Sequence, residues 1–483
     1  MTNAITVPLW IDGKEVNSST TFANVHGITR EASSNVAAAD ADVLNAAIAS
    51  NKAAFRGWAD TPAWQRRDVL NKFGDLFANT KDELFRLYST ETPVSGVIME
   101  SDFGYALSHI REAASICTQI KGDIPVTADN SLALVLREPY GCVLSVTPFN
   151  FAATLTLRAL VYPIACGNTV LCKASDRLPG YCLAIAKLFK EAGLPDGVLN
   201  LVQFDAKNVA ARMEQAISHP DVRMINFTGS VTVGRIVAGL CGKVGKPILL
   251  ELGGKAPAIV MPSADLEVAV NNILFAANAH GGQICMSTEV ALVHQDVYDR
   301  FVEVMQRVID SDVDALGEFS MINAAGASKP KELWADALSK GAKVLTKHQP
   351  SDHEAKIAAT VMTGVTPDMK LFNDESFGPN VSIVRVKDAA DAIEISNGSG
   401  FGLSSSIFTN DIMEGLAIAK LLETGAVHLN SGSVHDEPTI PHGGHKNSGH
   451  GRFNGAYAIQ SFTQTKTVRF GNLGAIPLHI LKN

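Results

Sequence analysis

Three side chains in the sequence are of the types that covalent chemistry at a carbonyl carbon requires. Cys285 lies in GGQICMSTE, where two glycines free the backbone and small or unbranched neighbours leave the sulfur accessible. Glu251 ends the apolar run of LLELGGKAP, and we expect burial there to raise its pKa toward a value useful to a general base. Asn150 follows an apolar run in VTPFNF, where its amide could donate to an oxyanion. Together they suggest a thiol nucleophile, a base and an oxyanion donor.

Each of these residues also has an ordinary structural explanation. Most free cysteines fill a core, and a carboxylate at the end of a strand is usually paired or hydrated. Asparagine is common in turns. Only the context of the three residues together can favour chemistry over structure.

The spacing of apolar residues indicates which helices and strands must position these three residues, and it changes along the chain. From Asp42 to about Glu112, apolar residues recur at helical spacing, which predicts a run of amphipathic helices. From 141 to about 260, short apolar runs alternate with helical ones, as in βαβ units around a parallel sheet. In such a sheet a nucleotide binds beyond the carboxyl ends of the strands, here just after TVLCK and MINFT. A second α/β series runs from about 256 to 430, and residues 311–330 look like an irregular surface loop.

Composition excludes several classes of protein. The chain has 483 residues and a net charge of −8, which predicts two or three domains, and its basic residues are not clustered as a nucleic-acid partner requires. Its seven cysteines are odd in number and form no CxxC pair, so we expect a reducing compartment and no metal site. There is no signal peptide pattern and no apolar run of about 18 residues, so we expect a cytoplasmic protein without a membrane partner.

The order of motifs along the chain resembles the aldehyde dehydrogenase superfamily, from WIDGK at Trp10 to TKTV near Val468. The motifs are TPFN, GNTVLCKAS, GLPDGVLN, FTGS followed by Gly234, ELGGK, GGQIC, ESFGP, GLSSSIF and PHGGHKNSGHGR. The 34 positions from Glu251 to Cys285 also match the family's spacing of base and nucleophile. The resemblance implies an α/β fold with a Rossmann-like NAD-binding domain, a second α/β catalytic domain and a small β oligomerisation element.

The resemblance also implies where these units lie. Residues 1–120 and 140–252 would form the NAD-binding domain, and residues 253–447 the catalytic domain. Residues 121–139 and 448–483 would form an oligomerisation arm, made of an SLALVLRE hairpin and a TKTVRF strand. We therefore expect a homodimer or a homotetramer.

The family's chemistry can be carried over to this sequence. Cys285 resembles the thiolate that attacks the aldehyde carbon to give a thiohemiacetal, and the Asn150 amide and the Cys285 backbone N–H would hold the oxyanion. Hydride transfer to the nicotinamide then leaves a thioester. Glu251 resembles the base that activates water to hydrolyse this thioester to the carboxylic acid, and its position could also serve to deprotonate the thiol.

The resemblance assigns ten residues to an NAD or NADP site: Pro148, Phe149, Lys173, Asp176, Gly229, Ser230, Gly234, Leu252, Glu375 and Phe377. Asp176 stands where the family usually has Glu. It is still acidic, so it should repel a 2′-phosphate and favour NAD. Phe453 replaces a Glu that many members carry, so a proton relay from that position is lost and Glu251 is left as the main base.

The segment HLNSGSVHDEPTIPHGG at 428–444, GRF at 451–453 and Arg158 look most like the branch of vanillin, benzaldehyde and salicylaldehyde dehydrogenases. We therefore predict an aromatic aldehyde as substrate, bounded by Phe151, Leu155, Arg158 and Met286. Arg158 could bind an acidic or hydroxylated substrate, or it could be a structural cation.

Other functions stay open at this point. The enzyme could act on an aliphatic aldehyde or a semialdehyde. A relative that passes the thioester to coenzyme A is disfavoured by Glu251, because such enzymes generally lack that base. A protein without activity on the same fold is disfavoured by the intact set of Cys285, Glu251 and Asn150.

Overall fold

The apolar runs between residues 141 and 260 form the middle of an eight-stranded sheet. In the computed structural model, which describes residues 6–311, 316–347 and 352–471, the strand order is β21-β11-β10-β7-β8-β9-β2-β3. The five strands from β11 to β9 are parallel, and the edge strands β21, β2 and β3 are antiparallel to their neighbours. Their bounds are β21 Gly449–His450, β11 Ile248–Glu251, β10 Val222–Thr228, β7 Cys142–Val146, β8 Thr169–Lys173, β9 Leu199–Val202, β2 Leu9–Ile11 and β3 Lys14–Val16.

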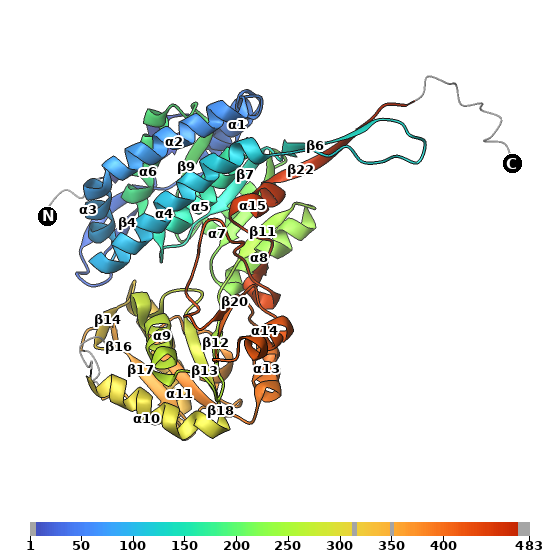
Figure 1. Ribbon diagram of the computed structural model, residues 1–483. Coiled ribbons are helices and arrows are strands. Elements are labelled where there is room, and N and C mark those ends of the chain that lie inside the picture. Colours follow the sequence, from blue (N-terminus) through green and yellow to red (C-terminus); the bar gives the residue numbers. More distant parts are fainter. Residues whose placement is uncertain (1–5, 312–315, 348–351, 472–483) are drawn as a thin grey trace.

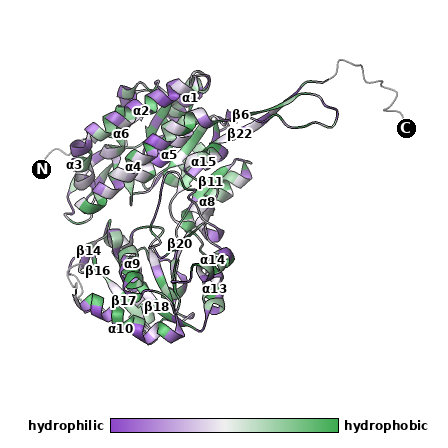
Figure 2. Cartoon of the chain, in the orientation of Figure 1, coloured by the Kyte–Doolittle hydropathy of each residue, from purple (hydrophilic) through white to green (hydrophobic). Residues whose placement is uncertain are grey.

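Helices cover both faces of this sheet (Figure 1). Successive residues of a strand point to opposite faces, so Val143 packs into one apolar core and Leu144 into another. The helices carry both hydrophobic and hydrophilic residues, as expected of elements with one face on a core (Figure 2). They are α1 Ala41–Ala59, α2 Ala63–Asn79, α3 Lys81–Glu91, α4 Gly96–Ile116, α5 Ala152–Ala165, α6 Pro179–Ala192, α7 Val209–Ser218, α8 Val231–Lys243 and α15 Gly455–Phe462.

A second sheet of seven strands follows along the chain, in the order β15-β17-β18-β13-β12-β19-β20, and only β15 is antiparallel. The strands are β12 Ala256–Val260, β13 Thr288–His294, β15 Lys343–Val344, β17 Thr360–Thr363, β18 Asn380–Val386, β19 Ser404–Phe408 and β20 Ala426–Leu429. One core joins it to α9 Leu266–Asn278 and α10 Gln295–Ser311, and another to α13 Ala389–Gly398 and α14 Ile412–Leu421. The short helix α12 spans Lys370–Asn373. Both α/β series predicted from the sequence are thus present.

The third unit is a two-stranded arm that projects from the body (Figure 1). Strand β6 (Ala133–Pro139) pairs antiparallel with β22 (Thr463–Arg469) along its whole length. Leu136 and Val468 on these strands are exposed, as are the flanking Leu132 and Phe470. Two small sheets complete the described structure, one of β1 Thr6–Val7, β5 Ala32–Ala37 and β4 Thr21–Val25, and one of β14 Glu318–Ser320 and β16 Lys356–Ala358.

The structure differs from the sequence prediction in two places. Residues 311–330 are not a single irregular loop, because α11 (Ala324–Ser339) begins inside this range, where Asn323 accepts a hydrogen bond from the backbone N–H of Gly326. Gly326 and Pro330 have low helix propensity, so the sequence does not predict this helix. Packing of its buried residues stabilises it. Residues 449–462 lie with the first sheet, because β21 pairs with β11 and α15 packs on α4 and α5, although we grouped them with the arm. The division into domains otherwise stays a prediction.

No helix in residues 6–311, 316–347 or 352–471 combines the length and the apolar character that crossing a membrane requires.

Candidate active site

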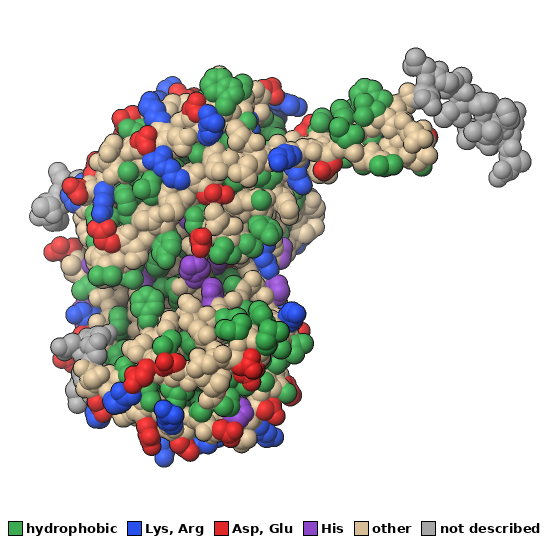
Figure 3. All heavy atoms as spheres, in the orientation of Figure 1, with side chains coloured by type: hydrophobic (Ala, Val, Ile, Leu, Met, Phe, Trp, Pro, Cys, Tyr) green, Lys and Arg blue, Asp and Glu red, His purple; other side chains and the backbone are tan. Residues whose placement is uncertain are grey.

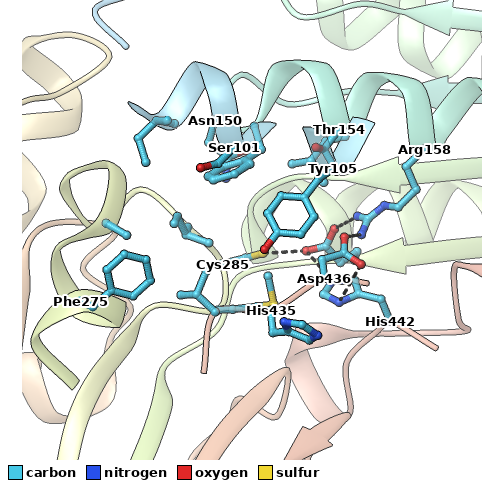
Figure 4. Close-up of a pocket in the computed structure, with 18 residues that line it drawn as sticks. Ser101, Tyr105, Asn150, Thr154, Arg158, Phe275, Cys285, His435, Asp436 and His442 are labelled. Carbon is cyan, nitrogen blue, oxygen red and sulfur yellow. Dashed lines mark hydrogen bonds and ion pairs between the residues drawn. The ribbon is translucent and has the colours of Figure 1, made fainter. Parts of the chain in front are cut away.

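The three residues proposed for chemistry meet between the two large α/β units. Cys285 Sγ donates a hydrogen bond to Glu251 Oε1 at 2.8 Å. The Asn150 amide donates to the backbone oxygen of Gln283 at 2.9 Å, and its second amide hydrogen leaves one donor for another partner. Side chains from several elements converge on this point (Figure 4). The structure therefore brings together the nucleophile, the base and the amide that the sequence suggested.

Cys285 is presented by a sharply bent segment between α9 and β13. His280, Gly281 and Gly282 all have positive φ values. A Cβ atom on Gly282 would lie 2.0 Å from the backbone oxygen of Gly378, so only glycine fits there. Of the seven cysteines, all of them within the described residues, Cys285 alone is only partly buried. The six others are core residues, as most free cysteines are.

Asn150 is positioned by the start of α5, which a residue of another helix caps. The α5 residues Ala153 and Thr154 donate their backbone N–H groups to the carboxylate of Asp102 on α4 at 2.9 and 2.8 Å. Tyr88 also donates to Asp102, at 3.1 Å. Asp102 is fully buried, so the N-terminus of α5 is held in one place. This in turn fixes the position of Arg158 on the same helix.

Glu251 is completely buried, yet its pKa is lowered rather than raised. Burial alone raises the pKa of this carboxyl group, but Arg158 and His442 outweigh burial and hold it at about 2. Arg158 Nη2 forms a very short ion pair with Glu251 Oε2, and Arg158 is itself only 1% exposed. The expectation of a raised Glu251 pKa was therefore wrong, because it considered burial alone and not a cation far away in the sequence.

The Cys285 thiol responds in the opposite direction. Burial and the neighbouring Glu251 carboxylate both raise the pKa of this thiol well above its usual range. The sulfur is thus protonated in this structure, and its proton faces a carboxylate that is ionised. Proton transfer from sulfur to Glu251 must accompany any attack by this thiol.

The cation that holds Glu251 also binds a second carboxylate. Arg158 Nη1 lies 2.8 Å from Asp436 Oδ2, and its guanidinium lies 4.3 Å from the centre of the Phe453 ring. Asn454 donates to Asp436 at 2.7 Å. Burial raises the pKa of Asp436, but His442 and Arg158 are the largest of the opposing causes, so the net shift is downward and the group is ionised. Arg158 is fully engaged by protein carboxylates, which favours the structural alternative over substrate binding.

Two cavities meet at Cys285. One has a volume of about 120 Å³, and its lining includes the predicted substrate residues Phe151, Leu155, Arg158 and Met286. The other has a volume of about 370 Å³, and both contain Asn150, Leu155, Glu251 and Cys285 in their walls. In the space-filling view apolar and histidine side chains gather along the waist between the two units (Figure 3). The reactive sulfur is thus reachable from two sides.

The larger cavity has groups that fit a dinucleotide. Gly229 and Ser230 lie at the N-terminus of α8, where backbone N–H groups attract phosphate. On the opposite wall, Glu375 accepts a hydrogen bond from the Gly254 N–H at 2.9 Å, and burial with the nearby Glu289 raises its pKa to about 7. Phe149 and Phe377 meet edge to face, with ring centres 6.3 Å apart, beside the sulfur. A phosphate site, a carboxyl group and aromatic walls suit a nucleotide with a flat ring.

A buried ion pair shapes the loop that carries Glu375 and Phe377. Lys255 Nζ lies 2.7 Å from Glu289 Oε2 and donates to the backbone oxygen of Asp374 at 2.9 Å. Glu289 in turn accepts the backbone N–H groups of Ser376 and Phe377. Phe377 is held at a φ of 56°, which a non-glycine residue rarely adopts.

Seven of the ten predicted cofactor residues line this cavity: Pro148, Phe149, Gly229, Ser230, Leu252, Glu375 and Phe377. Lys173 and Asp176 lie outside its lining, at the carboxyl end of β8, with Lys173 Nζ 3.9 Å from Asp176 Oδ1. Gly234 allows close packing of α8, since a Cβ atom there would lie 2.4 Å from Leu252 Cδ2.

Sequence reasoning missed several residues of both cavities. Asn323 and Lys329 of the α11 region line the larger one, and they fell in the stretch interpreted as a loop. Tyr105 and His442 line the smaller one, together with Asp436. The motif HDEP was noted for its resemblance only, and no pattern in the sequence tied Asp436 to Arg158.

Comparison with known proteins agrees with this geometry. Residues 10–468 match the aldehyde dehydrogenase family. The chain belongs to that family. It is 38% identical over 477 residues to vanillin dehydrogenase from Pseudomonas fluorescens, covering 96% of this chain and 98% of the relative. It is 36% identical to salicylaldehyde dehydrogenase from Pseudomonas sp. (strain C18), with 95% of each chain covered. The solved structure of a salicylaldehyde dehydrogenase from Pseudomonas putida G7, complexed with salicylaldehyde, has a TM-score of 0.93 at 34% identity, with 98% of this chain and 99% of that chain covered.

Family membership confirms the predicted fold class and enzyme class. This aldehyde dehydrogenase is an NAD(P)-dependent oxidoreductase that converts aldehydes to acids.

Replacing Arg158 should change how activity depends on pH. In Arg158→Leu, burial acts on Glu251 without the opposing cation, so the acid limb of the kcat/KM profile should move up by roughly one to three pH units. Arg158→Lys keeps the charge and should leave the limb within about one unit of the parent. Steady-state rates across the pH range measure the shift. If the acid limb of Arg158→Leu coincides with that of the parent, Arg158 is not the cation that lowers the Glu251 pKa.

Proposed function

We propose that this enzyme oxidises aromatic aldehydes to carboxylic acids through a thioester on Cys285, with NAD preferred over NADP. The observation that carries the proposal is the contact between Cys285 Sγ and Glu251 Oε1, made where the two cavities share a wall. A nucleophile reachable from two sides can react with a substrate in one cavity beside a coenzyme in the other.

The first step is attack by sulfur on the aldehyde carbon. The S–H proton passes to Glu251 as the carbon–sulfur bond forms, and the carbonyl oxygen becomes an oxyanion. The Asn150 amide and the Cys285 backbone N–H stabilise this charge, which is worth a few kcal/mol at the transition state (about 3–4 for one such donor). Gln283 keeps the Asn150 amide oriented by accepting one of its hydrogens.

The residues of the larger cavity would hold the coenzyme. Ser230 and the N-terminus of α8 suit the pyrophosphate, Glu375 the nicotinamide ribose, and Phe149 and Phe377 the ring. When bound, NAD(P) supplies the acceptor for the hydride of the substrate. Asp176 lies at the end of β8, half exposed, where its charge would repel a 2′-phosphate.

The last step is hydrolysis of the thioester. Glu251 accepts a proton from water, the hydroxide attacks the acyl carbon, and the carbon–sulfur bond breaks to release the acid. The Cys285 thiolate that leaves takes the proton back from Glu251, which restores the thiol and the ionised carboxylate. The presence of this carboxylate beside the sulfur supports hydrolysis rather than transfer of the acyl group to coenzyme A.

The substrate cavity supports an aromatic aldehyde. Its walls are mainly apolar, with Phe151, Phe275, Ile284, Met286 and Val434 around the sulfur. The relatives named above include vanillin and salicylaldehyde dehydrogenases, whose substrates are aromatic. A flat ring gains most from such walls, because each apolar contact removes surface from water.

We also propose that the enzyme is a homodimer or homotetramer of the cytoplasm. Exposed apolar residues on the arm, such as Leu136 and Phe470, support self-association. The seven free cysteines support a reducing compartment.

Loss of the nucleophile should abolish turnover but not coenzyme binding. Cys285→Ala removes the atom that forms the covalent bond, while Ser230 and Glu375 remain. We expect at least a thousandfold loss of kcat, roughly, and an NAD dissociation constant within about threefold of the parent. NADH absorbance and calorimetry measure the two effects, and Cys241→Ala, at a buried thiol of α8, is the control. Turnover within roughly tenfold of the parent would refute the assignment of Cys285.

Coenzyme preference should depend on Asp176. Asp176→Ser removes a negative charge and should raise the ratio of kcat/KM with NADP to that with NAD by roughly fivefold or more. Glu191→Ser removes the same charge at the other end of α6 and should leave the ratio unchanged. An equal ratio in Asp176→Ser and the parent would place the discriminating residue elsewhere.

Aromatic aldehydes should be better substrates than short aliphatic ones. We expect kcat/KM for benzaldehyde or vanillin to exceed that for acetaldehyde by at least roughly tenfold, which corresponds to about 1.4 kcal/mol of transition-state binding. A panel followed by NADH absorbance, with succinic semialdehyde included, measures this. Acetaldehyde or the semialdehyde as the best substrate would overturn the aromatic assignment and leave the dehydrogenase chemistry intact.

A further inference from the structure

The ionised groups beneath Cys285 form a buried cluster with an uncompensated charge. Glu251 and Asp436 are carboxylates, and Arg158 is the cation that bridges them. Their side chains are 0%, 11% and 1% exposed. When His442 is neutral, the three together carry one net negative charge away from water, which is costly. A proton that entered this cluster would neutralise it.

Glu251 cannot keep that proton. Burial raises its pKa, but the net shift is downward, with the Arg158 cation the largest of the opposing causes, so it is a weak base at neutral pH. Every turnover delivers the thiol proton to this carboxylate, and Glu251 must lose that proton before it can accept one from water. A second group must therefore take the thiol proton from Glu251 and return the carboxylate to its ionised form.

His442 is the group that lies next to the receiving oxygen. Its Nε2 is 3.7 Å from Glu251 Oε1, the same oxygen that accepts from Cys285 Sγ. Its Nδ1 is 4.0 Å from Asp436 Oδ1, so the imidazole ring stands between two carboxylates. Catalytic contacts are often this long before substrate binds and tighten afterwards.

The backbone holds His442 in this place. The N–H of His442 donates to the backbone oxygen of Phe453 at 3.3 Å, and the Phe453 N–H donates back at 2.8 Å. His442 itself is 8% exposed in its side chain and lines the substrate cavity.

We propose that His442 accepts the proton from Glu251 and that Asp436 stabilises the resulting imidazolium. The O–H bond of Glu251 breaks as the Nε2–H bond of His442 forms, and the proton later leaves to solvent. No oxidant or further reactant is needed. The inference rests on the proposed function, since it concerns the base of that reaction.

The other charged and titratable groups around His442 are consistent with this role. Arg158 on α5 binds both carboxylates and cannot accept a proton. His109 on α4 lies 3.8 Å from Asp436, but its Nδ1 contacts the Tyr162 hydroxyl at 3.0 Å. Burial lowers the pKa of His109 to about 4, so it stays neutral.

Two further groups complete the surroundings of His442. His428 on β20 interacts with it electrostatically, and burial lowers the His428 pKa to about 4. Cys285 reaches the same Glu251 oxygen from the other side. Among the histidines of the described residues that form ion-pair contacts with carboxylates, only His442 contacts Glu251.

The test is the pre-steady-state and steady-state production of NADH by His442→Ala with benzaldehyde. We expect a burst of about one NADH per active site, because attack and oxidation still occur once. The steady rate that follows should fall by roughly a hundredfold, a typical loss when a proton transfer is removed, with the KM for aldehyde within about threefold. Added imidazole should restore the steady rate, and a series of substituted imidazoles should restore it more as their basicity rises.

Two other variants keep the result interpretable. His442→Gln preserves a polar side chain but cannot accept the proton, so it should show the same loss if the alanine variant does not fold. His294→Ala is the control, because His294 also faces a carboxylate, Asp296, at 3.7 Å but lies outside both cavities. It should keep the parent's steady rate.

The outcomes separate this inference from the function on which it rests. A steady rate within about threefold of the parent in both His442 variants would refute the role of His442. Loss of rate that no imidazole restores, with a reduced burst, would also refute it and assign His442 a purely structural part. A parent enzyme that makes no NADH from any aldehyde would instead contradict the proposed function.

Discussion

The buried pair between Arg158 and Glu251 is the interaction on which the site depends. A carboxylate with no exposed surface would become protonated unless a cation faced it, because burial penalises the charged form. Arg158 can supply that cation only if α5 is held in position. Asp102 holds the N-terminus of α5 by accepting hydrogen bonds from the first N–H groups of the helix. The chemistry of Cys285 thus depends on a cap made by α4, some distance from the sulfur.

The reacting residues come from different units of the fold. Glu251 ends a strand of the first sheet, Cys285 lies between α9 and β13 of the second unit, and Asp436 lies in the segment that returns the chain from the second sheet to the first. The first unit thus supplies Glu251, the second supplies Cys285, and the returning segment supplies Asp436. Arg158 contacts both Glu251 and Asp436. Any movement between the two sheets would change the distance from sulfur to base. The position of β21 beside β11, antiparallel and next to Glu251, ties the returning chain to that base.

Much of this arrangement was predictable, and the failures share a cause. Periodicity located both parallel sheets and the helices between them, and the contexts of Cys285, Glu251 and Asn150 pointed to chemistry. The direction of the Glu251 pKa shift was not predictable, because its partner Arg158 lies 93 positions away and Asp436 is 278 positions from Arg158. The start of α11 was missed for a related reason, since packing against distant residues stabilises a helix that Gly326 and Pro330 disfavour locally. Hydrophobic periodicity and residue propensity indicate local secondary structure. Ion pairs between residues far apart in the sequence produce no pattern of this kind.

The electrostatics of the site also set when the thiol can react. The thiolate, and not the thiol, is the form of cysteine that reacts readily with oxidants and electrophiles. Burial and the ionised Glu251 both keep the Cys285 proton in place, so the resting sulfur is far less reactive than a sulfur beside a cation would be. The cost is that the thiol must lose its proton to a weak base during each turnover. A thiol that is kept protonated in this way needs a further proton acceptor beyond Glu251. The net negative charge of the cluster of Glu251, Asp436 and Arg158 favours movement of that proton away from the sulfur and into the cluster.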